Sequence, residues 1–184
     1  RGLTSETWVA VVRSATTDIP INTVNTMPYV DEQYHFLHNG YINKFSRSLR
    51  SCLRRELNPE FEDAIEGNTD SEHLFMLFRQ IMWEESISDP AMALQEMYWR
   101  LKLWLKDERA LLNIIIAQPG RFWAMRSAIN GNSPSLYYTV NPPTYPQAVL
   151  VASEPLTDAS DWTEVPPQTL FVVEHSDEPR HISL

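Results

Sequence analysis

The stretch Phe36-Leu37-His38-Asn39-Gly40-Tyr41-Ile42 is the one around which the rest of the chain is organised. It predicts a short apolar strand from Tyr34 to Leu37 that runs into a bend at His38-Asn39-Gly40. Asn-Gly is among the strongest turn dipeptides, because both residues tolerate positive φ. One interpretation is therefore a plain hairpin turn. The other is an oxyanion hole, in which Asn39 offers a side-chain N–H and Gly40 a backbone N–H that a substrate carbonyl can approach closely.

Composition narrows the class of protein. The chain has 184 residues, of which 43% are hydrophobic, so it is long enough for one domain over 1–184 with a real core. Its net charge of −9 makes a nucleic-acid surface a poor expectation. The longest apolar run, Leu111 to Ala117, is broken by Asn113 and is far below the roughly 20 residues of a membrane span. The single cysteine, Cys52, excludes an intrachain disulfide framework and fits a reducing, cytoplasmic compartment.

Local patterns predict strands in pairs with long helices between them, which is an α+β layered fold. Apolar runs predict strands buried in the core, and 3.6-residue periodicity with capping residues predicts helices. The predicted strands are Trp8 to Val12, Tyr34 to Leu37, Leu111 to Ala117, Phe122 to Met125, Val149 to Ser153 and Thr169 to Val173. The predicted helices run from Asn43 to about Leu57, from Thr69 and from Pro90, while 17–31, 129–147 and the polar tail are expected to be loops.

Two charged side chains beside these elements have both a structural and a functional interpretation. Arg13 ends the first predicted strand, where it is either a structural ion pair or a guanidinium fork for a substrate carboxylate. Thr69 and Glu72 fit a capping box that starts a helix. Asp70 lies in the first turn of that helix, where the helix dipole favours a carboxylate that can also receive an ammonium group.

Other kinds of site lack support in the sequence. The five histidines show no metal-ligand spacing, and the five glycines form no phosphate-binding loop. Cys52 falls on a predicted helix, where a free cysteine is usually a small buried residue. We therefore expect neither a metal nor a cofactor. The proline-rich segment Ser133 to Gln147 fits either a lid or a connector.

Four motifs in order resemble the class II (N-terminal nucleophile) glutamine amidotransferase family. These motifs are Arg13-Ser14-Ala15-Thr16, Asn25-x-x-Pro28, His38-Asn39-Gly40-Tyr41-Ile42 and Thr69-Asp70-Ser71-Glu72. A later segment resembles one branch of the family, the ergothioneine-pathway amidohydrolases and the γ-glutamyl-peptide-degrading amidotransferase-like proteins; it consists of Val151-Ala152-Ser153-Glu154-Pro155-Leu156, Trp162 and Val165-Pro166. The resemblance spans nearly the whole chain and implies a four-layer αββα sandwich.

The resemblance implies a role for each matching residue. Arg13 corresponds to the residue that binds the α-carboxylate of a glutamyl substrate, with Thr16 close by, and Asp70 to the residue that holds the α-ammonium group. Asn39 and Gly40 correspond to the oxyanion hole. Together these residues imply a small-molecule γ-glutamyl substrate.

The chain departs from the family at the nucleophile. The family uses an N-terminal cysteine whose own α-amino group is the base, but position 1 is Arg1, and Cys52 does not match the nucleophile position. The first strands of the fold are also missing before Trp8. We therefore expect the C-terminal portion of a single type 2 glutamine amidotransferase domain, inactive alone, with the nucleophile on a missing segment or a partner.

The expected activity is hydrolysis of a γ-glutamyl amide with release of glutamate. One alternative is a catalytically silent γ-glutamyl-binding subunit. Another is a glutaminase subunit that supplies ammonia to a partner synthase. The leaving group stays open among a hercynylcysteine derivative, a peptide and ammonia, and so does the oligomeric state.

Overall fold

The structure is a computed structural model that describes residues 5–12, 22–84, 87–174 and 178–184. Its centre is a six-stranded antiparallel sheet in the order β1-β2-β3-β4-β8-β9. The strands of this large sheet are β1 (Tyr29–Val30), β2 (His35–Ile42), β3 (Ala110–Gln118), β4 (Arg121–Ile129), β8 (Thr169–Glu174) and β9 (Arg180–Ser183). A small sheet has the order β6-β5-β7 and contains β5 (Tyr137–Val140), β6 (Val149–Ala152) and β7 (Thr163–Glu164).

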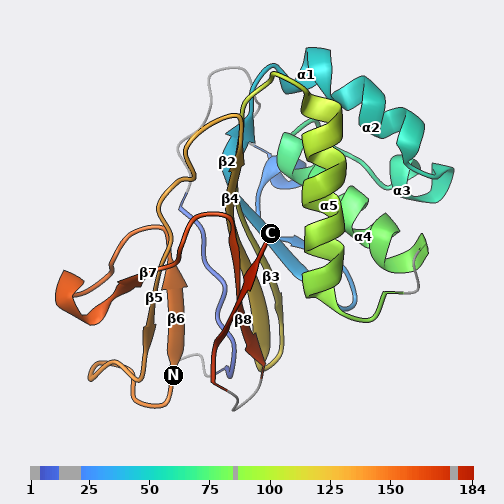
Figure 1. The fold of residues 1–184 in the computed structure, drawn as a ribbon. Helices are drawn as coiled ribbons and strands as arrows, with labels where there is room; N and C mark the ends of the chain where they lie inside the picture. The colour runs from blue at the N-terminus through green and yellow to red at the C-terminus, as the bar shows by residue number, and fades with distance from the viewer. Residues whose placement is uncertain (1–4, 13–21, 85–86, 175–177) are drawn as a thin grey trace.

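The five α-helices of the described residues gather on one side of the large sheet, and the small sheet lies on the other (Figure 1). The helices are α1 (Phe45–Ser48), α2 (Arg50–Glu56), α3 (Pro59–Asp63), α4 (Asp70–Glu84) and α5 (Pro90–Leu105). Two short 3₁₀ turns cover Thr23–Asn25 and Ala159–Asp161. The mixed α+β prediction is confirmed. Within the described ranges the layers are helices, large sheet and small sheet, so a second layer of α-helices does not form part of them.

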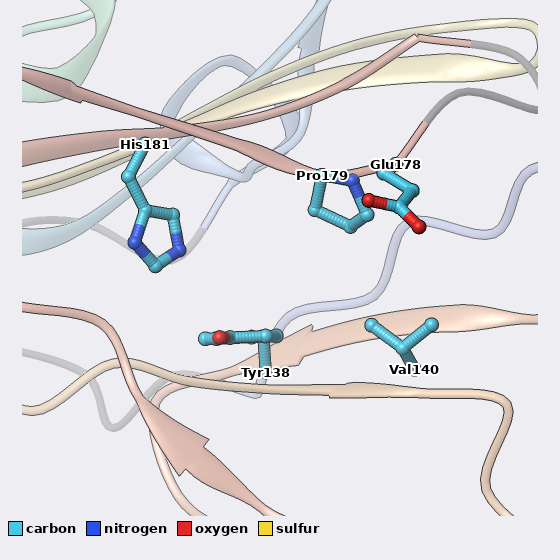
Figure 2. Close-up of a pocket in the computed structure, with 5 residues that line it drawn as sticks. All are labelled: Tyr138, Val140, Glu178, Pro179 and His181. Carbon is cyan, nitrogen blue, oxygen red and sulfur yellow. The ribbon is translucent and has the colours of Figure 1, made fainter.

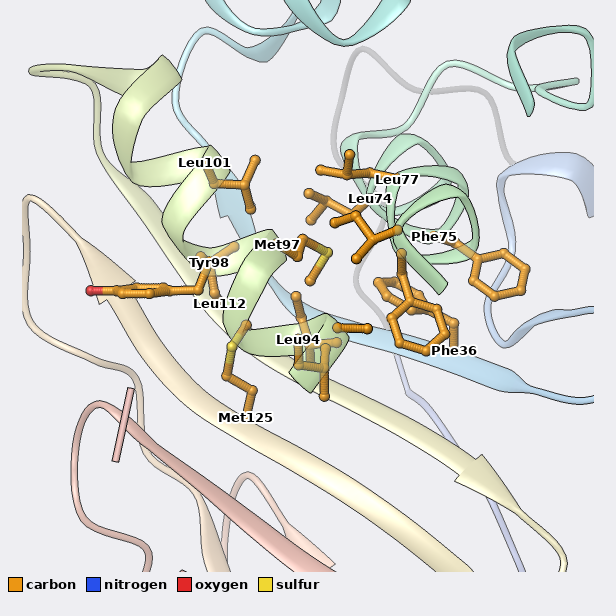
Figure 3. Packing of buried hydrophobic residues seen from close by; sticks show 14 of the residues in the cluster. Phe36, Leu74, Phe75, Leu77, Leu94, Met97, Tyr98, Leu101, Leu112 and Met125 are labelled. Carbon is orange, nitrogen blue, oxygen red and sulfur yellow. The ribbon is translucent and has the colours of Figure 1, made fainter. Parts of the chain in front are cut away.

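Alternation along the central strands explains why this sheet is covered on both faces. On β3, Leu112, Ile114 and Ile116 belong to the main core under the helices, whereas Ile115 packs with the cluster under the small sheet. The apolar stripes of α4 and α5 complete the main core (Figure 3), including Phe75, Leu77, Leu94, Met97 and Leu101. The α5 stripe is the one that its spacing predicts, and Asp89 caps this helix by accepting a hydrogen bond from Ala91 N at 2.9 Å.

The bend predicted at His38-Asn39-Gly40 is wrong. These residues continue β2 without interruption, because every residue from His35 to Ile42 pairs with β3. The turn preference of an Asn-Gly pair is a local effect, and eight consecutive cross-strand pairs outweigh it. The hairpin interpretation of this segment is therefore excluded.

The strand predicted at Trp8 to Val12 is also wrong. This segment is irregular, and exposure alternates along it, with Trp8 62% and Val12 fully exposed. It is held beside the β3–β4 turn, where the Thr7 hydroxyl oxygen accepts a hydrogen bond from Gly120 N at 2.9 Å. Only one of its faces is covered, so a strand buried on both faces does not form.

Other boundaries also differ from the prediction, among them β1, which lies inside the segment 17–31 that is expected to be a loop. The helix expected from Asn43 to Leu57 is interrupted at Leu49, a fully buried residue between α1 and α2. Strand β5 lies inside the proline-rich 129–147 segment, and β9 lies inside the polar tail. Both are four-residue strands without an apolar alternating pattern of their own, and backbone pairing with β6 and β8 defines them.

Candidate active site

The edge of β2 is open beyond the point where β1 ends. Strand β1 pairs only with His35 and Phe36. Further along this edge, His38 N donates to the Met27 sulfur at 3.2 Å and Ile42 N donates to Asp70 Oδ2 at 2.9 Å. N–H groups two residues apart in a strand point to the same side, so the N–H and C=O of Gly40 also point to this edge. No described strand pairs with the edge at Gly40, which leaves a backbone donor and acceptor exposed there.

Gly40 is required by close packing, not by an unusual backbone conformation. A Cβ at this position would lie 1.9 Å from the Leu111 carbonyl oxygen and 2.7 Å from His38 Nε2. The buried His38 ring fills that space, with Nε2 2.9 Å from Leu111 O and Nδ1 3.0 Å from Ser71 Oγ. A carbonyl oxygen can only accept, so Nε2 carries a hydrogen and donates it to Leu111 O. A glycine therefore keeps the backbone of β2 accessible on one side and tightly packed on the other.

Asn39 precedes this donor and its side chain is exposed. Side chains alternate along a strand, so Asn39 projects from the opposite face of the sheet to His38, the face covered by the small sheet. Its direct partner on β3 is Asn113. The Asn39 carboxamide and the Gly40 N–H thus emerge next to each other, one from the face and one from the edge of β2.

Asp70 joins the start of α4 to the same edge. Its Oδ2 accepts from Ile42 N at 2.9 Å, and its Oδ1 accepts from Ser71 N at 2.8 Å and from Ser71 Oγ at 3.1 Å. The carboxylate is half-buried, and three hydrogen bonds leave room on its oxygens for one more donor. Ile42 is two residues beyond Gly40, about 7 Å along the strand. The structure therefore brings Asn39, Gly40 and Asp70 together.

The first turn of α4 fixes Asp70. The Thr69 hydroxyl accepts from Glu72 N at 3.1 Å and lies 2.6 Å from the Tyr29 hydroxyl. The Glu72 carboxylate reaches past the usual position and accepts from Glu66 N and Gly67 N. The predicted Thr69 cap is thus present. The Glu72 carboxylate binds the backbone two and three residues before Thr69 and so closes a longer loop than a capping box does. Next in the helix is the buried His73, whose Nδ1 donates to Thr69 O at 2.8 Å.

Burial lowers the pKa of His73, and the nearby charges of Arg50 and Arg54 lower it further. The hydrogen bond to Thr69 O and the charge of Asp70 act in the opposite direction. The neutral ring also makes an edge contact with Phe45 at 5.0 Å between ring centroids. His73 is therefore a structural support under the turn that carries Asp70.

Two buried polar residues, Asn113 and Arg126, continue the cross-strand row that starts at Asn39 and were not predicted as site residues from the sequence. Asn113 Nδ2 donates to Ser135 O at 2.6 Å. Its neighbour on β4 is Arg126, whose three guanidinium nitrogens donate to Pro134 O at 2.6 Å, to Val165 O and to the Glu164 carboxylate at 2.7 Å. The interruption of the Leu111–Ala117 apolar run by Asn113 was the signal that could have identified this polar row.

The remaining predicted site residues, Arg13 and Thr16, lie outside the described residues. Cys52 is half-buried on α2, where it packs against the main core on the helical side of the sheet. Among the described residues, no three His, Cys, Asp or Glu side chains are grouped so as to hold a metal ion, and no helix has the length and apolarity to cross a bilayer.

A pocket of about 340 Å³ between β5 and β9 is separate from this site (Figure 2). It is lined by Tyr138, Val140, Glu178, Pro179 and His181. Strand β9 is at one edge of the large sheet and β1 is at the other, next to β2. The pocket is therefore not part of the group around Gly40.

Comparisons with known proteins point to one kind of protein. No protein-family model matches the sequence. The chain is 25% identical over 207 residues to the probable glutamine amidotransferase DUG3 of Saccharomyces cerevisiae, an alignment that covers 92% of this chain and 57% of the yeast protein. It superposes on a glutamine aminotransferase class-II domain protein from Silicibacter pomeroyi with a TM-score of 0.70 and 27% identity, covering 85% of this chain and 71% of that one. The chain is glutamine amidotransferase-like. It spans little more than half the length of the yeast protein.

A third comparison concerns the fold alone. A predicted glutamine amidotransferase from Pseudomonas aeruginosa matches with a TM-score of 0.54 and 19% identity, over 84% of this chain and 64% of that one. The glutamine amidotransferase-like chain thus has the mixed α+β fold of the class II structures, as the sequence resemblance implied.

Proposed function

We propose that this glutamine amidotransferase-like chain supplies the substrate-binding and oxyanion-stabilising part of an enzyme that hydrolyses γ-glutamyl amides. The observation that carries the proposal is the open edge of β2, where the Gly40 N–H is an exposed donor beside Asn39. Two N–H donors that converge where negative charge develops are the requirement for stabilising a tetrahedral intermediate.

Asp70 supports the same substrate class. Its carboxylate is bonded to Ile42 N, two residues along β2 from Gly40. This separation is about the length of an extended glutamine side chain. The Gly40 carbonyl points to the same edge as the Gly40 N–H. A substrate ammonium can therefore lie between the Asp70 carboxylate and this carbonyl while its γ-carbonyl oxygen faces Asn39. Arg13, with Thr16, completes the proposal as the group that binds the α-carboxylate.

In the reaction, a thiolate attacks the γ-carbonyl carbon and forms a carbon–sulfur bond, and the oxygen becomes an oxyanion held by Asn39 and Gly40. The carbon–nitrogen bond then breaks and the amine leaves with a proton. Water hydrolyses the thioester, which releases glutamate and regenerates the thiol. Cys52 is on the helical side of the large sheet, away from the face that carries Asn39. We therefore propose that the nucleophile is an N-terminal cysteine outside these 184 residues, and that the 184-residue domain alone is inactive.

The finer assignments belong to the same proposal. The substrate is a free γ-glutamyl head group, in the ergothioneine or γ-glutamyl-peptide branch of the family, and the enzyme acts in the cytoplasm without metal or cofactor. The name of the yeast relative, a probable glutamine amidotransferase, supports the reaction class.

The oxyanion donor is tested by Asn39→Ala in the complete enzyme that carries the cysteine. We expect kcat for glutamate release to fall by about 10²–10³, the usual effect of losing one oxyanion donor. The substrate should still bind, because the donor acts mainly in the transition state. A decrease in kcat of less than about threefold would contradict the assignment of Asn39.

The ammonium site is tested by Asp70→Asn in the 184-residue chain, with calorimetric binding of L-glutamine and of its analogue without the α-amino group. We expect the original chain to prefer L-glutamine and the variant to bind both ligands alike, because the variant lacks the charge that attracts the ammonium group. Each protein is compared with itself on two ligands, so a general loss of stability does not imitate the result. Equal preference for L-glutamine in both proteins would remove Asp70 from the site.

The position of Cys52 also favours a second function, a γ-glutamyl-binding subunit without catalysis. An intact mass of the protein isolated from its source separates the two. A polypeptide of 21.3 kDa that binds glutamine without turnover supports the binding subunit, whereas a heavier or second polypeptide with glutamate release supports the hydrolase.

A further inference from the structure

Only one of the two hydrogen-bonding groups of the Asn113 carboxamide has a partner within the described ranges. The residue is 3% exposed, and its Nδ2 donates to Ser135 O, but its buried Oδ1 accepts no hydrogen bond from the described residues. The short contact with a carbonyl oxygen identifies the bonded arm as the nitrogen, so the atom without a partner is an acceptor. Buried polar atoms nearly always have a partner, and an exception within a sheet next to the candidate site requires an explanation.

Few donors surround this oxygen. The neighbours of Asn113 along β3 on the same face are Leu111 and Ile115, which carry no side-chain donor. On the β4 side stands Arg126, whose guanidinium bonds Pro134 O, Val165 O and Glu164 and donates no hydrogen bond to this oxygen. On the β2 side the residue directly opposite is Asn39, whose exposed carboxamide carries two N–H groups.

We propose that Asn113 is a positioning residue that orients the Asn39 carboxamide for the oxyanion, an inference that rests on the function proposed above. Directly opposed residues of an antiparallel pair have Cβ atoms about 4.5–5.5 Å apart, so two carboxamides on one face can reach each other. A rotation of the exposed Asn39 side chain from its position in the structure then lets one of its Nδ2–H groups donate to Asn113 Oδ1. The other Nδ2–H is left pointing toward the site occupied by the substrate carbonyl.

This arrangement solves a problem that an exposed asparagine has as a catalytic donor. A freely rotating carboxamide must be ordered at the moment when the oxyanion forms, whereas a donor fixed beforehand needs no reorganisation. The hydrogen bond to Ser135 O fixes the Asn113 side chain. A fixed Asn113 can in turn restrict the rotation of the Asn39 carboxamide.

Two substitutions separate the acceptor role from a merely structural role. Asn113→Asp keeps the acceptor oxygen and removes the donor to Ser135, while Asn113→Leu removes both. If Asn113 only holds the 135 segment, the two variants are equally defective. If it orients Asn39, Asn113→Asp keeps the acceptor for the Asn39 carboxamide and retains more of its order than Asn113→Leu does. Tyr41→Phe is the matched control, because Tyr41 is a diagonal neighbour on β2 with a hydroxyl donor.

The first readout is NMR of the Asn39 side-chain amide in the 184-residue chain, assigned with Asn39→Ala. Without ligand, we expect Asn113→Leu to shift the Asn39 Nδ2 resonance and to speed its hydrogen exchange by about tenfold, roughly the effect of one hydrogen bond. Tyr41→Phe should leave the resonance and its exchange nearly unchanged, and Asn113→Asp should keep the exchange slow. Identical Asn39 signals in all four proteins, or an effect of Tyr41→Phe alone, would overturn the proposal.

The second readout is kinetic and uses the complete enzyme. Asn113→Leu should lower kcat by about tenfold or more with little change in KM, and Asn113→Asp should restore most of kcat. Adding L-glutamine to the labelled chain gives the independent control on function. If the Gly40 amide signal does not respond, the proposed function loses its support, while the contact between Asn113 and Asn39 is still decided by the chain without ligand.

Discussion

Gly40 is tightly packed on one side and carries the proposed oxyanion donor on the other. On one side the Leu111 carbonyl and the His38 ring leave no room for a Cβ. On the other side the same backbone is exposed at an unpaired sheet edge. A side chain at this position would push the strand away from β3 and so displace the donor.

This residue gives a stability prediction with a matched control. Gly40→Ala should lower the free energy of unfolding by about 1–3 kcal/mol or more, because the obstructing atom is a backbone carbonyl that cannot move without breaking the β2–β3 pairing. Gly131→Ala should cost much less, since its Cβ would meet the flexible Arg109 side chain at 2.7 Å. Urea denaturation measures both variants. Equal costs would contradict the role given to Leu111 O.

Three residues that the sequence assigns to one site lie together in the structure, whereas the local geometry of the Asn-Gly pair differs from the prediction. Asn39, Gly40 and Asp70 lie at one edge, although 30 positions separate Gly40 from Asp70 in the sequence. The Asn-Gly pair was nevertheless interpreted as a bend, because a turn propensity contains no information about the strand that will pair with it. Asn113 was missed for a related reason, since its partner Ser135 is contributed by a loop.

At the scale of elements, the N-terminus of α4 determines where Asp70 lies. Thr69, Glu72 and His73 each bind backbone groups of this turn or of the segment before it. Helix α4 was predictable because its cap and its apolar stripe are both local in the sequence. Strands β5 and β9 were not, because their definition depends on pairing with distant strands.

This turn should make stability depend on pH. Burial holds the pKa of His73 below its usual value of 6.5, so as pH falls below about 6.5 the unfolded chain takes up a proton that the native ring does not. The free energy of unfolding should therefore decrease in that range through this residue. His73→Asn keeps a donor for Thr69 O and should make the decrease smaller, as measured by urea denaturation at pH 7.5 and at pH 5.5. The exposed His181→Asn serves as the control, and equal slopes for the two variants would count against His73.

At the scale of the whole molecule, Arg126 links the two sheets. Its side chain extends from β4 and binds the Pro134 and Val165 carbonyls, which flank the small sheet, and Glu164 of β7. Beneath it, the cluster that contains Leu136, Val165 and Phe171 fills the space between the sheets. The small sheet is therefore held by one buried cation and a modest apolar cluster.

Removal of this cation should loosen the small sheet before the large one. Arg126→Leu should cost about 3 kcal/mol, since each buried acceptor left unpaired costs roughly 1–3 kcal/mol. Hydrogen exchange should become faster in β5–β7 than in β3. The exposed pair of Arg54 with Glu62 provides the control, because Arg54→Leu should cost less than about 1 kcal/mol. Uniformly faster exchange in both sheets would argue against Arg126 as a specific link.

The order of the strands has one further consequence, for how such a protein can diverge. Strands β4 and β8 are neighbours in the large sheet, and the whole small sheet is made by the continuous segment 137–164 between them. This continuous segment connects two strands that pair with each other. One contiguous stretch can thus be lengthened or replaced by recombination to give a new wall opposite Asn39, while the strand that carries Asn39 and Gly40 and the helix that carries Asp70 stay unchanged.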